Sequence, residues 1–590
     1  MDDFIFGTLS TEALRLAHQR ALRSGVTHHY ARSPRDPSPG QPVTLELSLG
    51  PEQAYDRAWV YWSIDGQDPV GKGGLASHGF ATPMEAVGAE WDMLEWGYLS
   101  RFRAVLPGQP GGTLVRYSLA AGAADGTETL ADQGNFYAYY VDDAAPPEWA
   151  YDAIIYQIFS DRFSPGQGRS WLEPESPSGF YGGTLRGITE NLDYIADLGA
   201  TAIWLTPIFP SPTHHRYDTT DFFDIDPRLG DKNDLRVLID GAHQRGLRLL
   251  LDIVPNHLSR LHPAFQQALA DRNCPSASWF TFYQWPEQYK AYFDVQEMPE
   301  LNLRHPAARQ YLLDAAAYWL DFGVDGYRVD YAIGPTPDFW ADFRRVTRAA
   351  NPDCWTFGEV VEPSDSQLSF HGLLDGCLDF ILLEGLRQTF AFRRWDGRRF
   401  ASFLERHEAY FPADFSRPSF LDNHDMNRYL WAAGGDKDSL KLAALCQFTL
   451  TGPPIIYYGT ECGLSQERDV RQDGRGLPEE ARLPMLWGEA QDLELLDYYR
   501  NLARLRRAHP SLRRGVRRTL QADAETLVYS RQHEGERLAT AINLSANPRS
   551  IYLPGEWYAI ALASRPGARL ITRPGGAAIE LPPFSGAALV

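Results

Sequence analysis

The chain alternates between short apolar runs and helical stretches over about 355 residues, starting near Trp149. Eight strand-like runs can be counted: 153–159, 201–209, 247–254, 326–330, 355–360, 378–382, 417–425 and 453–461. Strands that alternate with helices predict parallel pairing through helical crossovers, and eight such units predict an α/β fold of the (β/α)8 TIM-barrel type. A doubly wound open sheet is the alternative, but no G-x-G-x-x-G follows the first strand.

The segments on either side of the alternating region have a different pattern. Short β-like runs bounded by Gly, Pro and Asp predict an N-terminal antiparallel β-sandwich, and a similar pattern at the other end predicts a small C-terminal antiparallel β domain. Ser10 is a candidate cap for a helix that precedes the sandwich. The predicted division is a helix and linker at 1–40, a β-sandwich at 41–145, the barrel at 146–508 with a small insertion after strand three at about 257–304, and a β domain at 509–590.

Charge and cysteine content exclude several classes of function. Lys and Arg number 56 against 76 Asp and Glu, a net charge of −20, so a nucleic-acid partner and a polybasic membrane anchor are not expected. No apolar run reaches 18 residues, and the acidic start of the chain lacks the features of a signal peptide. Five scattered cysteines have no metal-ligand spacing, so we predict reduced thiols, no metal ligands and a cytoplasmic location.

The ends of four predicted strands carry polar side chains. In chain order these are Asp252, Asn256 and His257, then Arg328 and Asp330, then Glu359, and then Asp422, Asn423, His424 and Asp425. Asp330 and Glu359 are 29 residues apart, and Glu359 and Asp425 are 66 apart, close to one and two βα units of about 30 residues. Because barrel strands all end on one rim, we expect the three carboxylates to meet there.

Three carboxylates on one rim fit two kinds of chemistry. They can bind a hard cation, or they can hydrolyse a glycosidic bond, which needs a nucleophile and a protonated acid. Arg328 lies two residues before Asp330, so it faces the same side of the strand and can keep that carboxylate ionised. His257 and His424 suit hydrogen bonding to sugar hydroxyls, and an aromatic content of 13% supplies flat faces for pyranose rings. These neighbours favour glycoside hydrolysis.

The same segments resemble the motifs of a known family. DIVPNH, GYRVD, FGEV and FLDNHD look like the four short motifs of the α-amylase superfamily of glycoside hydrolases, family 13. The resemblance extends from about Ala153 to Trp487. MPELN at Met298–Asn302, YQIFSDRF near Tyr156 and HHRYDTTDFFDIDP near Tyr217 are similar to the neopullulanase, cyclomaltodextrinase and maltogenic amylase subgroup.

The resemblance implies a role for each matched residue. Asp330 matches the nucleophile, Glu359 the general acid/base, which must start the reaction protonated, and Asp425 the third carboxylate. The residues that match substrate-binding positions are Tyr217, Asp218, His257, Arg328, His424 and Arg482. For Asp252, Asn256 and Asp422 a hydrogen-bonding support role is at least as well favoured as substrate contact.

Some positions depart from the family pattern. Glu359 is followed by Val360, Val361 and Glu362, where subgroup members usually have a Trp, which puts a preference for cyclodextrin or pullulan in doubt. The loop after YQIFSDRF is poor in the Asn and Asp ligands of the subgroup's calcium site. We therefore expect no required cofactor and disfavour calcium.

These observations predict a retaining α-glucan hydrolase acting on α-1,4 links, and as a further hypothesis α-1,6 links, of maltooligosaccharides or related short α-glucans. An α-glucosyltransferase or isomerase on the same scaffold is the alternative, since both reactions share the covalent intermediate. A non-catalytic sugar-binding protein is a more remote one. The N-terminal module resembles an accessory domain that supports dimers in relatives, so a homodimer is a further hypothesis.

Overall fold

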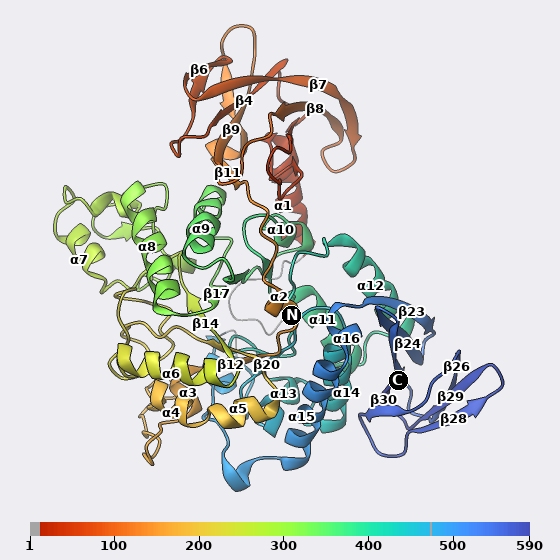
Figure 1. Ribbon diagram of the computed structural model, residues 1–590. Helices are drawn as coiled ribbons and strands as arrows, with labels where there is room; N and C mark the ends of the chain where they lie inside the picture. The colour runs from red at the N-terminus through yellow and green to blue at the C-terminus, as the bar shows by residue number, and fades with distance from the viewer. Residues whose placement is uncertain (1–11, 473–474) are drawn as a thin grey trace.

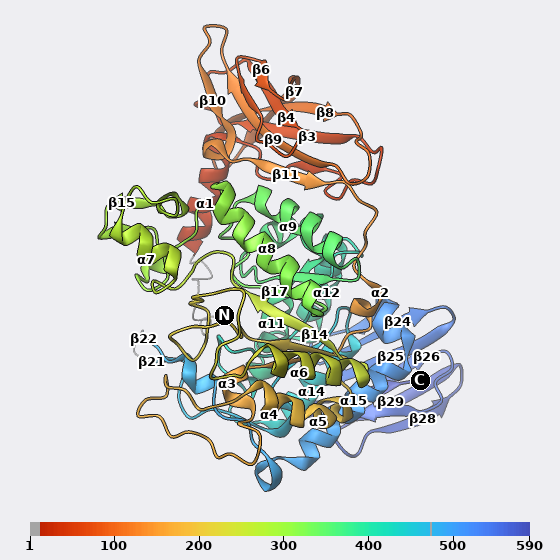
Figure 2. The same ribbon diagram turned by 60° about the vertical axis from the view of Figure 1, so that its left-hand side comes forward.

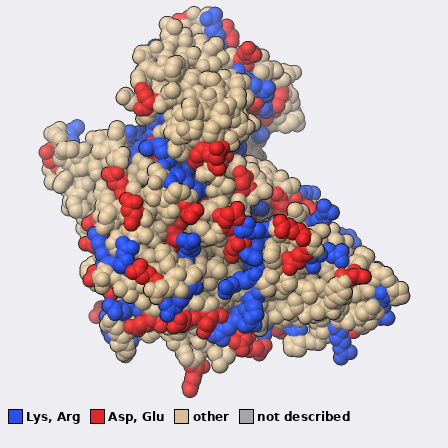
Figure 3. All heavy atoms as spheres, viewed as in Figure 1, with Lys and Arg blue, Asp and Glu red and all other residues tan. Residues whose placement is uncertain are grey.

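The computed structural model describes residues 12–472 and 475–590, with a central barrel and β modules on two sides (Figure 1). The N-terminal module stands at one end of the molecule and the C-terminal strands lie beside the barrel helices α14 and α15, as the rotated view also shows (Figure 2). On the face seen in Figure 3, charged side chains of both signs cover the barrel, whereas the N-terminal module carries few. Ser10, the predicted helix cap, lies outside the described residues.

The central sheet is parallel and closes into a ring. Its order is β19-β18-β17-β14-β13-β12-β20. The strands are β12 (Ile155–Ile158), β13 (Ala202–Leu205), β14 (Arg248–Ile253), β17 (Gly326–Val329), β18 (Trp355–Gly358), β19 (Gly376–Cys377) and β20 (Ile455–Tyr457). Between β19 and β20, Ser416 bridges Gly376 and Ser419 bridges Pro454, both in parallel. This segment occupies the remaining position of the ring, so the predicted (β/α)8 barrel is confirmed.

One strand prediction is wrong in its position. The run 378–382 was expected to form the sixth strand, but the strand is the shorter β19 just before it, and the helix α11 (Phe380–Leu386) begins inside the run. The physical reason is a cap: the Asp379 carboxylate accepts a hydrogen bond from the Leu382 backbone N–H at 2.9 Å, which satisfies a free donor of the first helical turn.

Helices surround the ring, and the strands of the ring separate two apolar cores. They are α4 (Leu185–Glu190), α5 (Leu192–Leu198), α6 (Lys232–Gln244), α8 (Pro306–Phe322), α9 (Pro337–Ala350), α10 (Ser364–Leu368), α12 (Gly397–Tyr410), α14 (Lys437–Thr449) and α15 (Leu493–Ala508). One core lies between helices and strands. The other fills the barrel interior with large side chains such as Trp204, Trp355 and Phe357. The interior is therefore packed, and polar chemistry is confined to the strand ends.

The segment between β14 and α8 carries the insertion. It contains α7 (Pro263–Ala270), the short 3-10 turns η2 (Ala277–Trp279) and η3 (Tyr292–Asp294), and the hairpin of β15 (Phe282–Gln284) and β16 (Gln288–Tyr289). His257 at its start forms an antiparallel bridge with Glu300 near its end. The insertion thus returns to the rim of the barrel.

The N-terminal module begins with α1 (Glu12–Ser24), and its strands form a folded antiparallel arrangement. They are β1 (Val26–Thr27), β2 (Arg32–Ser33), β3 (Val43–Leu49), β4 (Arg57–Ser63), β7 (Phe80–Asp92), β8 (Gly97–Leu106), β9 (Leu114–Gly122), β10 (Glu128–Leu130) and β11 (Tyr137–Tyr140), and β5 (Val70–Lys72) and β6 (Leu75–His78) form a separate hairpin. The long β7 pairs with β4 through its first half and with β8 through its second, so it joins the two layers around one core. β1 and β2 lie in the stretch predicted as a linker and pair with β3.

The C-terminal module follows α16 (Pro510–Arg514) and has two antiparallel sheets. One contains β23 (Val516–Ala522), β24 (Thr526–His533), β25 (Glu536–Asn543), β30 (Ser585–Leu589) and β27 (Ile560–Ala563); the other contains β26 (Arg549–Pro554), β29 (Gly576–Leu581) and β28 (Arg569–Arg573). The expected β modules on both sides of the barrel are thus present. In the described part of the chain, no helix has both the length and the apolarity required to span a bilayer.

Candidate active site

The pairing of three neighbouring strands brings the candidate carboxylates together. Asp252 on β14 is the register partner of Arg328 on β17, and Val329 is the partner of Gly358 on β18. The next residues along, Asp330 and Glu359, are therefore neighbours: the Glu359 N–H donates to the Val329 carbonyl at 2.8 Å. Because side chains alternate along a strand, Arg328 and Asp330 face the same side.

The buried Arg328 guanidinium joins three carboxylates. Its Nη1 donates to Oδ1 of Asp330 and to Oδ1 of Asp252, each at 2.8 Å, and its Nη2 lies 2.7 Å from Oε1 of Glu359. The two carboxylates on the cavity side are thus held by the two terminal nitrogens of one planar group. The shared guanidinium therefore brings Asp330 and Glu359 close together.

Tyr217 and His424 form a second set of contacts beside this cluster. Their rings stack at 5.4 Å with an angle of 3° between planes, and the Tyr217 hydroxyl lies 2.6 Å from His424 Nε2 while donating to Asp252 Oδ2 at 2.9 Å. Gln157 donates its amide Nε2–H to His424 Nδ1 at 2.9 Å. Because Nδ1 accepts this hydrogen bond, the neutral His424 ring carries its proton on Nε2. Burial holds the pKa of this histidine well below its usual range, so the ring stays neutral.

Asp425 is oriented by an arginine from a different element. Arg482 donates from Nη2 to Asp425 Oδ1 at 2.8 Å and from Nε to the His424 carbonyl at 2.8 Å. Both side chains are buried. Burial raises the pKa of Asp425 to about 6, and Arg482 opposes this rise because it stabilises the ionised form.

Burial also perturbs the other carboxylates of the cluster. It raises the pKa of Asp330 well above its usual range and that of Asp252 to about 7, while Arg328 acts against both shifts. One guanidinium faces three carboxylates in a dry environment, and three full negative charges there are strongly unfavourable. Burial and mutual repulsion therefore favour the protonated forms of Asp330 and Asp252, and Arg328 opposes them.

Asp330, Glu359 and Asp425 line a cavity of about 150 Å³. Its lining residues are His215, Tyr217, His257, Tyr292, Met298, Asp330, Glu359, Asp425, Pro478, Glu479 and Arg482. Six of the nine residues predicted for the site are among them. Arg328 and His424 lie behind this lining and bond to Asp330 and Tyr217.

Asp218 differs from the other predicted residues. Its side chain is buried and accepts hydrogen bonds from the Ser211 hydroxyl, at 2.6 Å, and from the Thr213 hydroxyl. Asp218 holds the loop that presents Tyr217 and does not line the cavity.

Five lining residues were missed by the sequence analysis: His215, Tyr292, Met298, Pro478 and Glu479. Tyr292 lies in η3 of the insertion and stacks on His257 with ring centroids 4.5 Å apart. Tyr292 does not follow a barrel strand, because the insertion reaches the rim by its own fold. An aromatic residue six positions before the matched MPELN motif was the only sequence signal.

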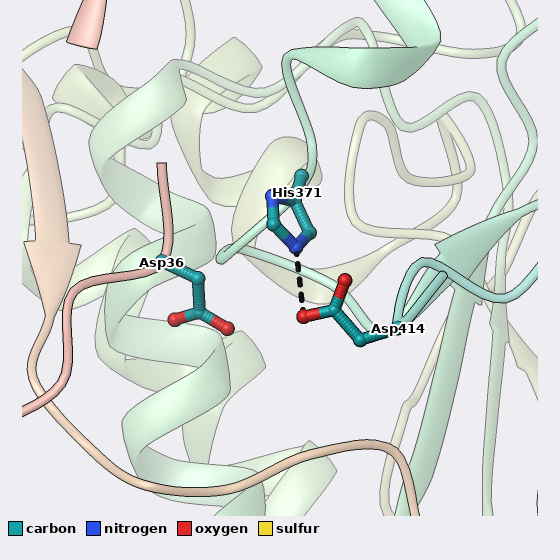
Figure 4. Close-up of side chains that lie close together, drawn as sticks. All are labelled: Asp36, His371 and Asp414. Atoms are coloured by element: carbon teal, nitrogen blue, oxygen red, sulfur yellow. Dashed lines mark hydrogen bonds and ion pairs between the residues drawn. The ribbon is translucent and has the colours of Figure 1, made fainter. Parts of the chain in front are cut away.

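Within residues 12–472 and 475–590, one group of three side chains places metal-ligand atoms within 4.8 Å of one another: Asp36, His371 and Asp414. His371 Nε2 lies 3.2 Å from an Asp414 carboxylate oxygen, and Asp36 faces the pair from the N-terminal segment (Figure 4). Arg344 Nη2 already lies 3.2 Å from Asp36 Oδ2. This guanidinium beside the group disfavours a divalent cation, and the cluster is better described as an ionic junction between the N-terminal segment and the barrel.

Comparisons with known proteins agree with this geometry. The family described as "Alpha amylase, catalytic domain" matches residues 157–494. Alpha-amylase 2 of Dictyoglomus thermophilum is 40% identical over 419 residues, which cover 71% of this chain and 74% of that protein. A cyclomaltodextrinase of a Bacillus species is 37% identical over 427 residues, covering 68% and 74%. A solved cyclomaltodextrinase structure superposes with a TM-score of 0.69 at 28% identity, covering 96% of this chain and 99% of that one. The chain therefore belongs to the α-amylase family of glycoside hydrolases.

Proposed function

We propose that the chain is a retaining hydrolase of α-1,4 links, and also of α-1,6 links, in maltooligosaccharides and related short α-glucans. The observation that carries this proposal is the placement of Asp330 and Glu359 on the two terminal nitrogens of Arg328 at the floor of the cavity. A short separation of two carboxyl groups leaves no room for water between them and favours direct attack by one of them. The relatives named neopullulanase and cyclomaltodextrinase support the substrate class.

The first step forms a covalent intermediate. An Asp330 oxygen attacks the anomeric carbon while Glu359 gives its proton to the departing glycosidic oxygen, and the electron pair of the broken C–O bond leaves with that oxygen. A water then gives a proton to Glu359 as its oxygen attacks the same carbon, which releases Asp330. Two inversions retain the α configuration.

Neighbouring groups position the sugar and stabilise the charge that develops. Arg328 donates a hydrogen bond to Asp330 and favours its ionised form, and Asp425, oriented by Arg482, accepts hydrogen bonds from ring hydroxyls. Tyr217 supplies an aromatic face, and His257, whose pKa burial lowers to about 3, hydrogen bonds as a neutral group. None of these contacts requires a metal.

The mechanism is tested by following maltotriose hydrolysis with proton NMR. We expect the first product anomer to be α, longer oligosaccharides to stay minor, and Asp330→Asn to lose turnover by more than about 10⁴-fold. In Glu359→Gln the loss should be about 10²–10⁴-fold on maltotriose but much smaller on an aryl maltoside, whose leaving group needs no proton. A β product would contradict the proposal, and predominantly longer products would favour the transferase.

We also propose an intracellular homodimer. A relative named intracellular maltogenic amylase, from Bacillus subtilis, supports the location. Exposed apolar side chains on and between β7 and β8, including Trp91, Met93, Trp96 and Tyr98, provide a surface for association. Sedimentation velocity at micromolar concentration should show a dimer, and Trp96→Asp should shift it to monomer. A wild-type protein that sediments only as monomer contradicts this part.

A further inference from the structure

The turn by which the insertion returns to the catalytic rim presents one aromatic ring to solvent. Phe293 lies in η3 and is 50% exposed, although the Tyr292 side chain beside it is buried. α7 and β15 of the same insertion stand out from the barrel beside α8 (Figure 2). A half-exposed phenyl ring keeps apolar surface in contact with water, so a ligand that covers the ring gains free energy.

The backbone holds Phe293 in an uncommon conformation. Phe293 has φ 47° and ψ 37°, and Asp294 follows with φ 60°, both in the left-handed region that bulky residues rarely adopt. Three backbone hydrogen bonds keep the turn closed, each at 2.9 Å: from Tyr292 N–H to the Met298 carbonyl, from Val295 N–H to the Tyr292 carbonyl and from Met298 N–H to the Val295 carbonyl. The Phe293 ring is therefore carried by a tightly bonded turn, and residues strained in this way concentrate at ligand-binding sites.

Tyr331, the residue after the proposed nucleophile, contacts this ring from the barrel side. The ring centroids of Phe293 and Tyr331 are 5.5 Å apart, and each ring also contacts Tyr292, at 4.6 and 4.9 Å respectively. Tyr331 has φ 40°, so it is a second bulky residue in the left-handed region. Tyr292 lines the catalytic cavity. The three rings therefore form one cluster that extends from the cavity to the surface.

The cluster borders the proposed general acid/base. The Tyr331 N–H donates to Glu359 Oε2 at 3.2 Å. In the proposed mechanism Glu359 protonates the departing oxygen, so the sugar attached to that oxygen lies beside Glu359. The stretch 360–362, which follows Glu359 on the same strand end, contains no aromatic residue. Phe293 and Tyr331 are therefore aromatic rings placed to contact the departing sugar.

We propose that Phe293, supported by Tyr331, is the platform on which the departing sugar stacks and on which an acceptor sugar later takes its place. This inference rests on the proposed covalent mechanism. The C–H face of a glucose ring packs on an aromatic face, and the phenyl ring of Phe293 offers a wide apolar surface for it. A hydroxyl of the stacked acceptor gives its proton to Glu359 as its oxygen attacks the anomeric carbon, which releases Asp330. Phe293 thus sets the share of the glycosyl-enzyme that is transferred to a sugar instead of to water.

Partition of the glycosyl-enzyme tests this role. α-Maltosyl fluoride has no sugar on the departing side, so fluoride release reports how fast the intermediate forms and turns over. With added glucose, hydrolysis yields maltose and transfer yields a trisaccharide, and the ratio of their initial rates measures use of the acceptor position. Phe293→Asn removes the ring and suits a left-handed backbone, so we expect this ratio to fall at least about 5-fold with little change in Tm.

A comparison of two donors provides a second readout. In Phe293→Asn, kcat/KM on maltotriose should fall at least about 5-fold more than kcat/KM on α-maltosyl fluoride, because only maltotriose places a departing sugar on the ring. Phe293→Tyr keeps the aromatic face and should hold both the donor preference and the partition ratio within about 2-fold of wild type. A role of Phe293 in stability alone would lower both donors equally.

Tyr283→Ala is the matched control. Tyr283 lies on β15 of the same insertion and is 70% exposed, so its removal should change neither the partition ratio nor the donor preference. A trisaccharide-to-maltose ratio in Phe293→Asn equal to that of wild type overturns the role of Phe293, and a change from dimer to monomer as the only effect would make the ring a subunit contact instead. A wild-type protein that releases no fluoride contradicts the covalent mechanism itself, and the platform with it.

Discussion

At the scale of single residues, the site has few cationic side chains in contact with its several carboxylates. Arg328 contacts Asp252, Asp330 and Glu359, while Arg482 serves Asp425. Removing water makes each of these contacts stronger, and it also makes each unpaired charge more costly. The two arginines therefore oppose the rise in pKa that burial causes at Asp252, Asp330 and Asp425.

This arrangement predicts a pH dependence that a mutation should shift. The pKa of Asp425 is raised to about 6, chiefly by burial, so its ionised fraction falls as pH drops through 6. If ionised Asp425 binds the sugar, the acidic limb of kcat/KM should lie near pH 6 rather than near 4. Arg482→Gln removes the group that lowers this pKa, so the limb should move upward by about 1 unit or more.

The pH profile of kcat/KM on maltotriose measures this shift. Arg248→Gln, on the same barrel but at the start of β14 and paired with Asp325, is the matched control and should leave the limb in place. If the acidic limb of kcat/KM stays near pH 6 in Arg482→Gln, a group other than Asp425 causes this limb.

At the scale of elements, the position of the nucleophile depends on close contact between β17 and β18. A Cβ built on Gly326 would lie 2.0 Å from the Trp355 carbonyl oxygen, so the strands can approach only because this residue has no side chain. Arg328 and Asp330 follow two and four residues later. The glycine that opens β17 therefore sets the register in which they meet Glu359.

Gly326→Ala should push β17 away from β18. We expect the free energy of unfolding to fall by about 1–3 kcal/mol, and kcat to fall more than the loss of folded protein explains, because Asp330 moves relative to Glu359. Thermal unfolding by circular dichroism and active-site titration separate the two effects. Gly25→Ala, where no atom lies within 4 Å of the added carbon, should leave both unchanged; equal behaviour of the two variants would show that β17 tolerates the side chain.

At the scale of the whole molecule, a buried ionic cluster fastens the N-terminal module to the barrel. Arg116 on β9 donates to Asp338 Oδ2 at 2.8 Å and also to Asp342, both on α9, and Arg309 on α8 contacts the same two carboxylates. All four side chains are largely buried. Although burial raises the pKa of Asp338, Arg309 and Arg116 outweigh it, and the net pKa is below the usual value.

Arg116→Met should therefore loosen the module. Because the pKa of Asp338 is lowered in the folded protein, its contribution to stability is present above the unfolded pKa near 4 and disappears as pH falls through the folded value. We expect the variant to lose about 3 kcal/mol at pH 7 and less at pH 3. Differential scanning calorimetry at the two pH values measures this difference.

Arg103→Met provides the comparison on the same module. Arg103 is half exposed and pairs with Glu46, so its loss should cost less than about 1 kcal/mol. A similar, small change in Tm for both variants would indicate that the buried cluster does not hold the module in place.

The barrel and the polar residues of its rim follow from patterns along the chain. Hydrophobic periodicity and the spacing between motifs can be seen in the chain alone, and the parallel strands of a barrel all end on the same rim. Asp330, Glu359 and Asp425 could therefore be located without coordinates. The placement of strand six failed because a single cap at Asp379 turned an apolar run into a helix.

Other features of the site arise from packing between distant segments. Tyr292 reaches the cavity through the insertion, and Asp218 turns toward Ser211 instead of the cavity. Each depends on contacts between segments far apart in the chain, whose geometry no local pattern encodes. Whether a charged side chain is neutralised, buried or left with a free donor is fixed when those segments pack together.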